Sequence, residues 1–205
     1  MRLARARACV PEGEGAIRRA RMDRQFPSGR WVLAILLVSI VLWAAMVFGT
    51  LAHLRRLAGG LDPFDVRPFG YSTGQARLLL DALGDAGREF YARVQLRLDA
   101  VYPAIYALSR GLMLWWLTVP GRLRTAPIVL QLRIILAGMP AAAAAFDYAE
   151  NIQIARMLAT GSGVETAVIE AASRMTVLKS LFSSASETCV IVLAVIAGLR
   201  WRRRR

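Results

Sequence analysis

Residues 31–54 form the feature that most restricts how this chain can fold. The segment runs from Trp31 to Leu54 and contains no charged side chain apart from the titratable His53. A helix rises roughly 1.5 Å per residue, so about twenty apolar residues cross the hydrocarbon core of a bilayer. The run exceeds the apolar stretch of about 7 to 15 residues in a signal peptide. We therefore expect a transmembrane helix that is retained as an anchor.

Composition extends this expectation to the whole chain. Its 205 residues are 56% hydrophobic, with a mean hydropathy of +0.42, on the apolar side of soluble proteins. Three further segments are apolar enough to be candidates for crossing. The predicted fold is all-α, a four-helix transmembrane bundle, and its spans are residues 31–54, 100–119, 128–154 and 176–199.

The remaining segments are polar. We expect residues 1–30 to be a basic, disordered cytoplasmic segment, residues 31–199 to be the transmembrane domain, and residues 200–205 to be a basic cytoplasmic tail. Between the first two spans, residues 54–98 mix arginines with acids, which predicts a solvated extracytoplasmic loop.

Turn and capping signals predict helices within this loop. Ser72 and Gln75 have the spacing of a capping box and are expected to open a short amphipathic helix. Gly84 is placed to end that helix. A second helix then leads, with a bend at Pro103, into the second span.

Charge predicts the orientation. The formal net charge is +13, and the basic residues cluster before the first span, after the last, and between the second and third. Because such residues favour the cytoplasmic side, we expect both termini in the cytoplasm of a bacterial inner membrane. The expected partner of these clusters is a bilayer with anionic headgroups, and we do not expect nucleic-acid binding.

Charged residues also interrupt the spans. Arg110 and Glu187 lie at matching depths near the bilayer midplane, where an unpaired charge costs about 2.5 to 3.5 kcal/mol. We therefore predict an Arg110–Glu187 ion pair inside the bundle.

The third span adds polar residues on one helix face, at i, i+3 and i+4, and Tyr106 shares a face with Arg110. Together they are expected to line a polar cleft that opens to the outer side. The candidate intramembrane cluster comprises Tyr106, Arg110, Asp147, Glu150, Asn151 and Glu187.

Two interpretations of this cluster stay open. Its members can be interhelical hydrogen bonds that fix the packing, or they can mark a ligand pathway, a proton relay or a headgroup site. The first describes a multi-pass, non-enzymatic membrane protein that binds a lipid, a second copy or a partner membrane protein. The alternative is a small transporter or lipid-modifying enzyme. The sequence contains no metal-ligand cluster or cofactor motif, so neither is expected.

Short motifs resemble those of uncharacterised four-pass bacterial membrane proteins, a resemblance that implies no activity. They are Gly70-Tyr71-Ser72, Leu83-Gly84, Gly87-Arg88, Tyr91, Asp99, Tyr102-Pro103, Phe146-Asp147-Tyr148 and Glu150-Asn151.

The four-span plan, with Arg124-Thr125-Ala126-Pro127, is also similar to the four-helix membrane family that includes sterol isomerases and the sigma-2 receptor. That resemblance implies acids in the bundle and, in the enzymes, a histidine. The only histidine here, His53, is expected at a membrane edge, which argues against isomerase chemistry.

Overall fold

The computed structural model describes residues 28–119 and 130–202. Within these ranges every regular element is a helix, as predicted. The expectations for residues 1–27, for the proposed start of the third span after Pro127, and for residues 203–205 lie outside the described residues.

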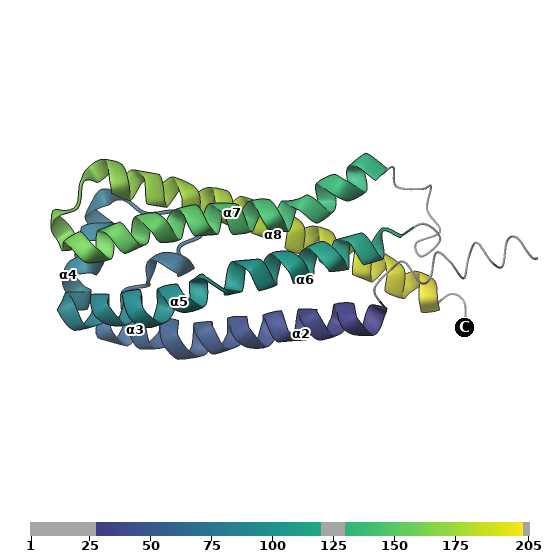
Figure 1. Ribbon diagram of the computed structural model, residues 1–205, viewed down its shortest axis with the longest axis horizontal. Coiled ribbons are helices and arrows are strands. Elements are labelled where there is room, and N and C mark those ends of the chain that lie inside the picture. Colours follow the sequence, from purple (N-terminus) through teal and green to yellow (C-terminus); the bar gives the residue numbers. More distant parts are fainter. Residues whose placement is uncertain (1–27, 120–129, 203–205) are drawn as a thin grey trace, which may run out of the picture.

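Four long helical segments run side by side along the long axis of the molecule (Figure 1). The start of the first, the end of the second, the start of the third and the end of the fourth lie at one end of the molecule. The segments are α2 (Gly29–Ala45) with its continuations η1 (Met46–Leu51) and α3 (Ala52–Leu57), then α6 (Tyr102–Leu117), α7 (Leu130–Thr160) and α8 (Thr166–Arg202).

Three of these segments are long and apolar enough to cross a membrane: Gly29–Leu57, Leu130–Gly163 and Thr166–Arg200. The predicted second span corresponds to α6, which has 16 residues and is too short to belong to that set. The structure therefore confirms an all-helical fold over the described residues, with three helical segments of the membrane-spanning type.

The last two helices extend beyond the predicted spans. α7 continues to Thr160 and α8 begins at Thr166. The short η4 (Gly161–Gly163) joins them.

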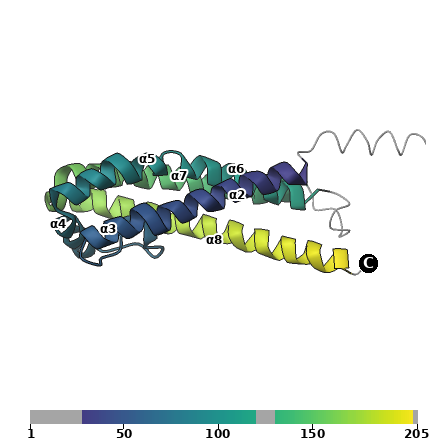
Figure 2. The same ribbon diagram turned by 90° about the horizontal axis from the view of Figure 1, so that it is seen from below.

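The segment between α3 and α6 forms a cap at the other end of the molecule (Figures 1 and 2). We call residues 58–99 the cap. Its elements are η2 (Phe64–Val66), α4 (Thr73–Phe90), η3 (Tyr91–Gln95) and α5 (Leu96–Asp99).

The structure confirms two local features that the sequence predicts in the cap, the capping box and the helix break. The Gln75 amide donates to Ser72 Oγ at 3.2 Å, and the Ser72 amide donates to Gln75 Oε1 at 2.9 Å, so the capping box is present. At Gly84 the backbone leaves helical geometry with φ 58° and ψ −170°, a conformation that favours glycine. Pro103 lies in the first turn of α6, which is a new helix rather than a bent continuation of α5.

Apolar side chains gather near both ends of the four long helical segments. The larger cluster joins the cap to the adjacent ends of α7 and α8 and includes Phe64, Tyr91 and Ile154. The smaller one lies near the opposite end and contains Val32, Met113, Leu114, Leu117 and Val190. Polar side chains occupy the space between the two clusters.

Candidate functional site

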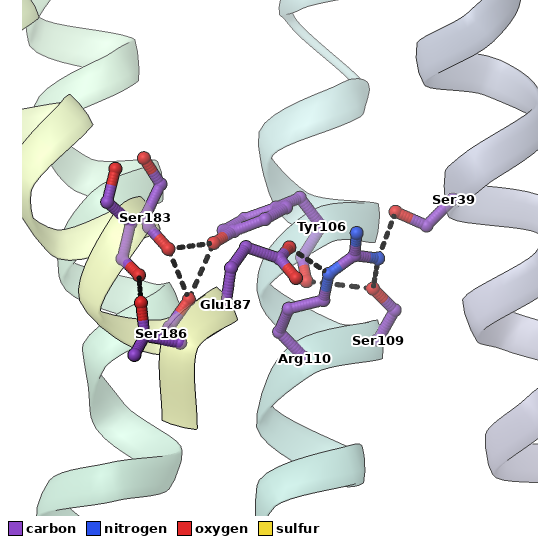
Figure 3. A network of polar contacts seen from close by, with 9 residues as sticks. Ser39, Tyr106, Ser109, Arg110, Ser183, Ser186 and Glu187 are labelled. Atoms are coloured by element: carbon purple, nitrogen blue, oxygen red, sulfur yellow. Dashed lines mark hydrogen bonds and ion pairs between the residues drawn. The ribbon is translucent and has the colours of Figure 1, made fainter. Parts of the chain in front are cut away.

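Arg110 connects three helices, α2, α6 and α8 (Figure 3). Its Nε lies 2.5 Å from Glu187 Oε1 on α8, so the predicted ion pair is present. Its Nη1 donates to Ser39 Oγ on α2 and to Ser109 Oγ, both at 3.1 Å. The guanidinium is largely buried, and its Nε and Nη1 are paired with acceptors on α2, α6 and α8.

Tyr106 lies one turn before Arg110 and supports it. The Arg110 guanidinium carbon lies 5.2 Å from the centre of the Tyr106 ring, within the range of a cation–π contact. The Tyr106 hydroxyl lies 2.6 Å from Ser186 Oγ and donates to the Ser183 carbonyl at 3.3 Å (Figure 3). We call Ser39, Tyr106, Ser109, Arg110, Ser186 and Glu187 the Arg110 group.

A second polar group surrounds Lys179 on α8, two turns from Glu187 toward the cap. Lys179 Nζ lies 2.5 Å from Glu150 Oε2 and 3.7 Å from Asp147 Oδ1. The Thr176 hydroxyl donates to Glu150 Oε1 at 2.7 Å. The Asn151 amide donates to Asp147 Oδ1 at 3.2 Å. We call Asp147, Glu150, Asn151, Thr176 and Lys179 the Lys179 group.

The six predicted residues thus divide between two neighbouring groups. Tyr106, Arg110 and Glu187 belong to the Arg110 group, and the three polar residues of α7 belong to the Lys179 group. Sequence reasoning missed that Lys179 pairs with the α7 acids. The signal was present, because Lys179 and these acids lie at similar depths on adjacent predicted spans.

The cap adds a third set of polar contacts. Gln95 accepts a hydrogen bond from Thr50 Oγ1 at 2.5 Å and donates to Asp99 Oδ2 at 3.0 Å. The Tyr91 hydroxyl donates to Asp65 Oδ2. These contacts bring two cap carboxylates toward the Lys179 group.

Burial and neighbouring charge alter the acidity of the cap groups. Burial, followed by the nearby carboxylates of Asp65 and Asp147, raises the pKa of Asp99 to about 9. Burial also raises the pKa of Tyr91, and the adjacent Asp65 raises it further. Asp99 therefore holds a proton at neutral pH.

A cavity of about 500 Å³ joins all three sets of contacts. Helices α2, α6, α7 and α8 form its walls, and the η2 segment covers its cap end. Its volume falls in the range of about 300 to 1,000 Å³ that is typical of ligand pockets. Its charged lining residues are Asp65, Asp99, Arg110, Asp147, Lys179 and Glu187. Glu150 lies behind Lys179 and is fully buried.

The exposed lining residues locate the mouth of the cavity. Ile40 and Trp43 on α2 are 44% and 48% exposed, and the Glu187 side chain on α8 is 38% exposed. On the opposite walls, Arg110 and Ala143 are buried. The cavity therefore opens sideways between α2 and α8, with an apolar rim on α2.

Comparison with protein-family models, with curated proteins and with solved structures finds no match for this chain. Among the described residues, no group of three or more His, Cys, Asp or Glu side chains is placed to hold a metal ion.

Proposed function

We propose that this chain is a four-pass protein of the bacterial inner membrane that binds a lipid in the cavity between its helices. The fourth crossing is α6. Its 16 residues extend about 24 Å, and the two residues on each side bring the segment to about 30 Å, the thickness of a hydrocarbon core.

Contacts of α6 with its neighbours support this crossing. At Gly111 an added Cβ would lie 3.2 Å from the Ala137 carbonyl, so α6 and α7 approach closely there. Small residues allow such contact between helices in lipid. Arg110 bonds to both α2 and α8. A helix enclosed in this way shares the environment of its neighbours.

The orientation follows from the arginine clusters. Residues 1–30 and 200–205 lie in the cytoplasm, where they contact anionic headgroups, and the cap lies outside. The support is that the start of α2 and the end of α8 lie at the same end of the molecule, away from the cap (Figures 1 and 2).

The observation that carries the function is a charged cavity with an apolar, sideways mouth. In a bilayer, this mouth faces acyl chains. A ligand that fills the cavity therefore needs a polar end that contacts the charged lining residues and an apolar end that contacts the rim on α2. Lipids have this chemistry.

The lining also restricts the headgroup. Four lining carboxyl groups compare with two lining cations, Arg110 and Lys179, and both cations are already paired. Asp99 holds a proton, but a carboxyl group that is ionised only accepts hydrogen bonds. We therefore propose a headgroup that supplies donors, either hydroxyl or amine groups.

The alternative is a transporter or lipid-modifying enzyme that uses the same charged residues. Transport needs a path to the cytoplasmic end, and the smaller apolar cluster, with Val32, Leu114 and Val190, closes that end. Binding is therefore the function that the geometry favours. Net transfer of the retained lipid across the membrane of vesicles that contain only this protein would establish transport instead.

Lipid retention tests the proposal. The protein is purified in detergent, and lipids that remain bound are detected by native mass spectrometry and identified after extraction. We expect the wild-type protein to retain a lipid with hydroxyl or amine donors in its headgroup. Ala143→Leu places a larger side chain at the buried wall of the cavity and should abolish retention.

Ala145→Leu is the matched control, because Ala145 lies on the same helix and is exposed. It should retain as much lipid as the wild type. Ser180→Leu fills the cavity from α8 and serves if Ala143→Leu does not fold. Wild-type protein without bound lipid, or a folded cavity variant with undiminished lipid, would refute the proposal.

A further inference from the structure

Phe69 is the most exposed large apolar side chain of the cap. It is 95% exposed, whereas two aromatic neighbours in the chain, Phe64 and Tyr71, are 0% and 8% exposed. A single exposed apolar residue is ordinary in a soluble protein. The position of Phe69 between two buried rings, next to a membrane-type helix, sets it apart.

Contacts on both sides fix the loop that carries Phe69. The Phe64 ring packs against the rings of Tyr71 and Tyr91, with centroids 4.8 and 6.1 Å away. The Arg67 guanidinium donates to the Asp62 carbonyl at 2.9 and 2.7 Å. Phe69 is therefore held outside the cap core, and its exposure is built into the loop.

The loop also contacts α8 directly. The Tyr71 amide donates to Ser173 Oγ at 2.9 Å. Gly70 has a φ of +77°, and a Cβ there would lie 2.5 Å from Ser173 Oγ and 3.1 Å from Val177 Cγ2. Phe69 precedes this contact by one residue, so it lies beside the cap end of α8.

Two exposed apolar side chains lie on the neighbouring part of α8. Val177 and Leu181 are one turn apart and are 42% and 62% exposed. In the proposed topology, which places α8 in the bilayer, they contact lipid near the outer surface. Phe69 adds a third exposed apolar side chain, on the part of the cap that adjoins this helix.

We propose that residues 66–70 form a membrane anchor in which Phe69 inserts into the outer leaflet of the bilayer. This inference rests on the proposed function, because it needs α8 to span the membrane. Aromatic side chains are favoured at the boundary between headgroups and acyl chains. Insertion also fixes the position of the adjoining η2 segment, which covers the cap end of the cavity and lines it with Asp65 and Val66.

Spin labels test the anchor. Cys9 and Cys189 are replaced by serine, and single cysteines at Phe69, Leu181 and Ala82 carry a nitroxide in lipid vesicles. Leu181 is the lipid-facing reference, and Ala82 is exposed on α4 and is the water-facing reference. The ratio of collisions with oxygen to collisions with a water-soluble nickel chelate measures contact with lipid.

We expect the ratio at Phe69 to be several-fold above the ratio at Ala82 and close to that at Leu181. A ratio equal to that at Ala82 would show Phe69 in water and overturn the anchor. Shielding from both reagents would show a protein partner and would also overturn it. The proposed topology fails separately, if the Leu181 label itself behaves as in water.

Discussion

Removal of the Arg110 side chain should disturb the packing of α2, α6 and α8. Arg110→Met leaves Glu187 without its partner and Ser39 without its donor. An unpaired charge at this depth costs about 2.5 to 3.5 kcal/mol, so we expect a clear fall in the thermal midpoint of the protein in detergent. Adding Glu187→Leu removes the orphaned charge and should recover most of the loss. Equal midpoints for the single variant and the wild type would contradict the ion pair.

Asp99 should make stability depend on pH. Its folded-state pKa of about 9 lies above the ordinary value of 3.8, so between these values the folded state holds a proton that the unfolded state releases. The contribution of Asp99 to the free energy of unfolding is fully present below about pH 4 and is lost as the pH rises toward 9.

Asp99→Asn is the matching variant, because it keeps a neutral polar group. We expect the wild-type thermal midpoint to fall more steeply than that of Asp99→Asn between pH 5 and pH 8. This interval of about three pH units lies between the unfolded-state and folded-state pKa values of Asp99, where the two states differ by one bound proton. Parallel curves would show that Asp99 is ionised in the folded protein.

Part of the residue-level picture could be predicted. The Arg110–Glu187 pair follows from depth matching, because charge in lipid demands a partner. Matching depths also pair Lys179 with the acids of α7, a pairing that the sequence prediction omits. The role of Asp65 and Asp99 in the cavity had no local signal, because it depends on how the cap folds back over the helices.

Helices α6 and α7 approach each other closely at Gly111. A Cβ on Gly111 would lie 3.2 Å from the Ala137 carbonyl, whereas Gly138 has no neighbour within 4 Å of that position. Alanine at an open helical site gains about 0.5 to 1 kcal/mol over glycine.

We therefore expect Gly138→Ala to match or exceed the wild-type thermal midpoint, and Gly111→Ala to fall below both. If Gly111→Ala were as stable as Gly138→Ala, the two helices would not pack at this point.

Element boundaries were predictable where a local signal exists. The capping box at Ser72 and the break at Gly84 depend on nearby backbone contacts, so the sequence predicts both. α8 begins at Thr166, ten residues before the predicted fourth span, because hydropathy reports the apolar part of a helix and not its end. Glu170 and Arg174 form an exposed pair in this early part of α8.

At the scale of the whole molecule, the all-helical class and long apolar helices follow from composition, but the cavity does not. It forms because α2 and α8 both bond to Arg110 and still leave a sideways mouth beside Ile40 and Trp43. Such a shape depends on the angles between helices, which no short sequence motif specifies.

The proposed lipid-facing mouth requires that all four helical segments cross the bilayer, and the proposed orientation requires that the cap lies outside. Single cysteines at Ala82, Gly163, Arg124 and Arg202, in a chain lacking Cys9 and Cys189, should be treated with an impermeant maleimide in intact cells. We predict labelling at Ala82 and Gly163, and labelling at Arg124 and Arg202 only after the membrane is permeabilised. Labelling of Arg124 in intact cells would show that α6 does not cross, and the reverse pattern would contradict the orientation.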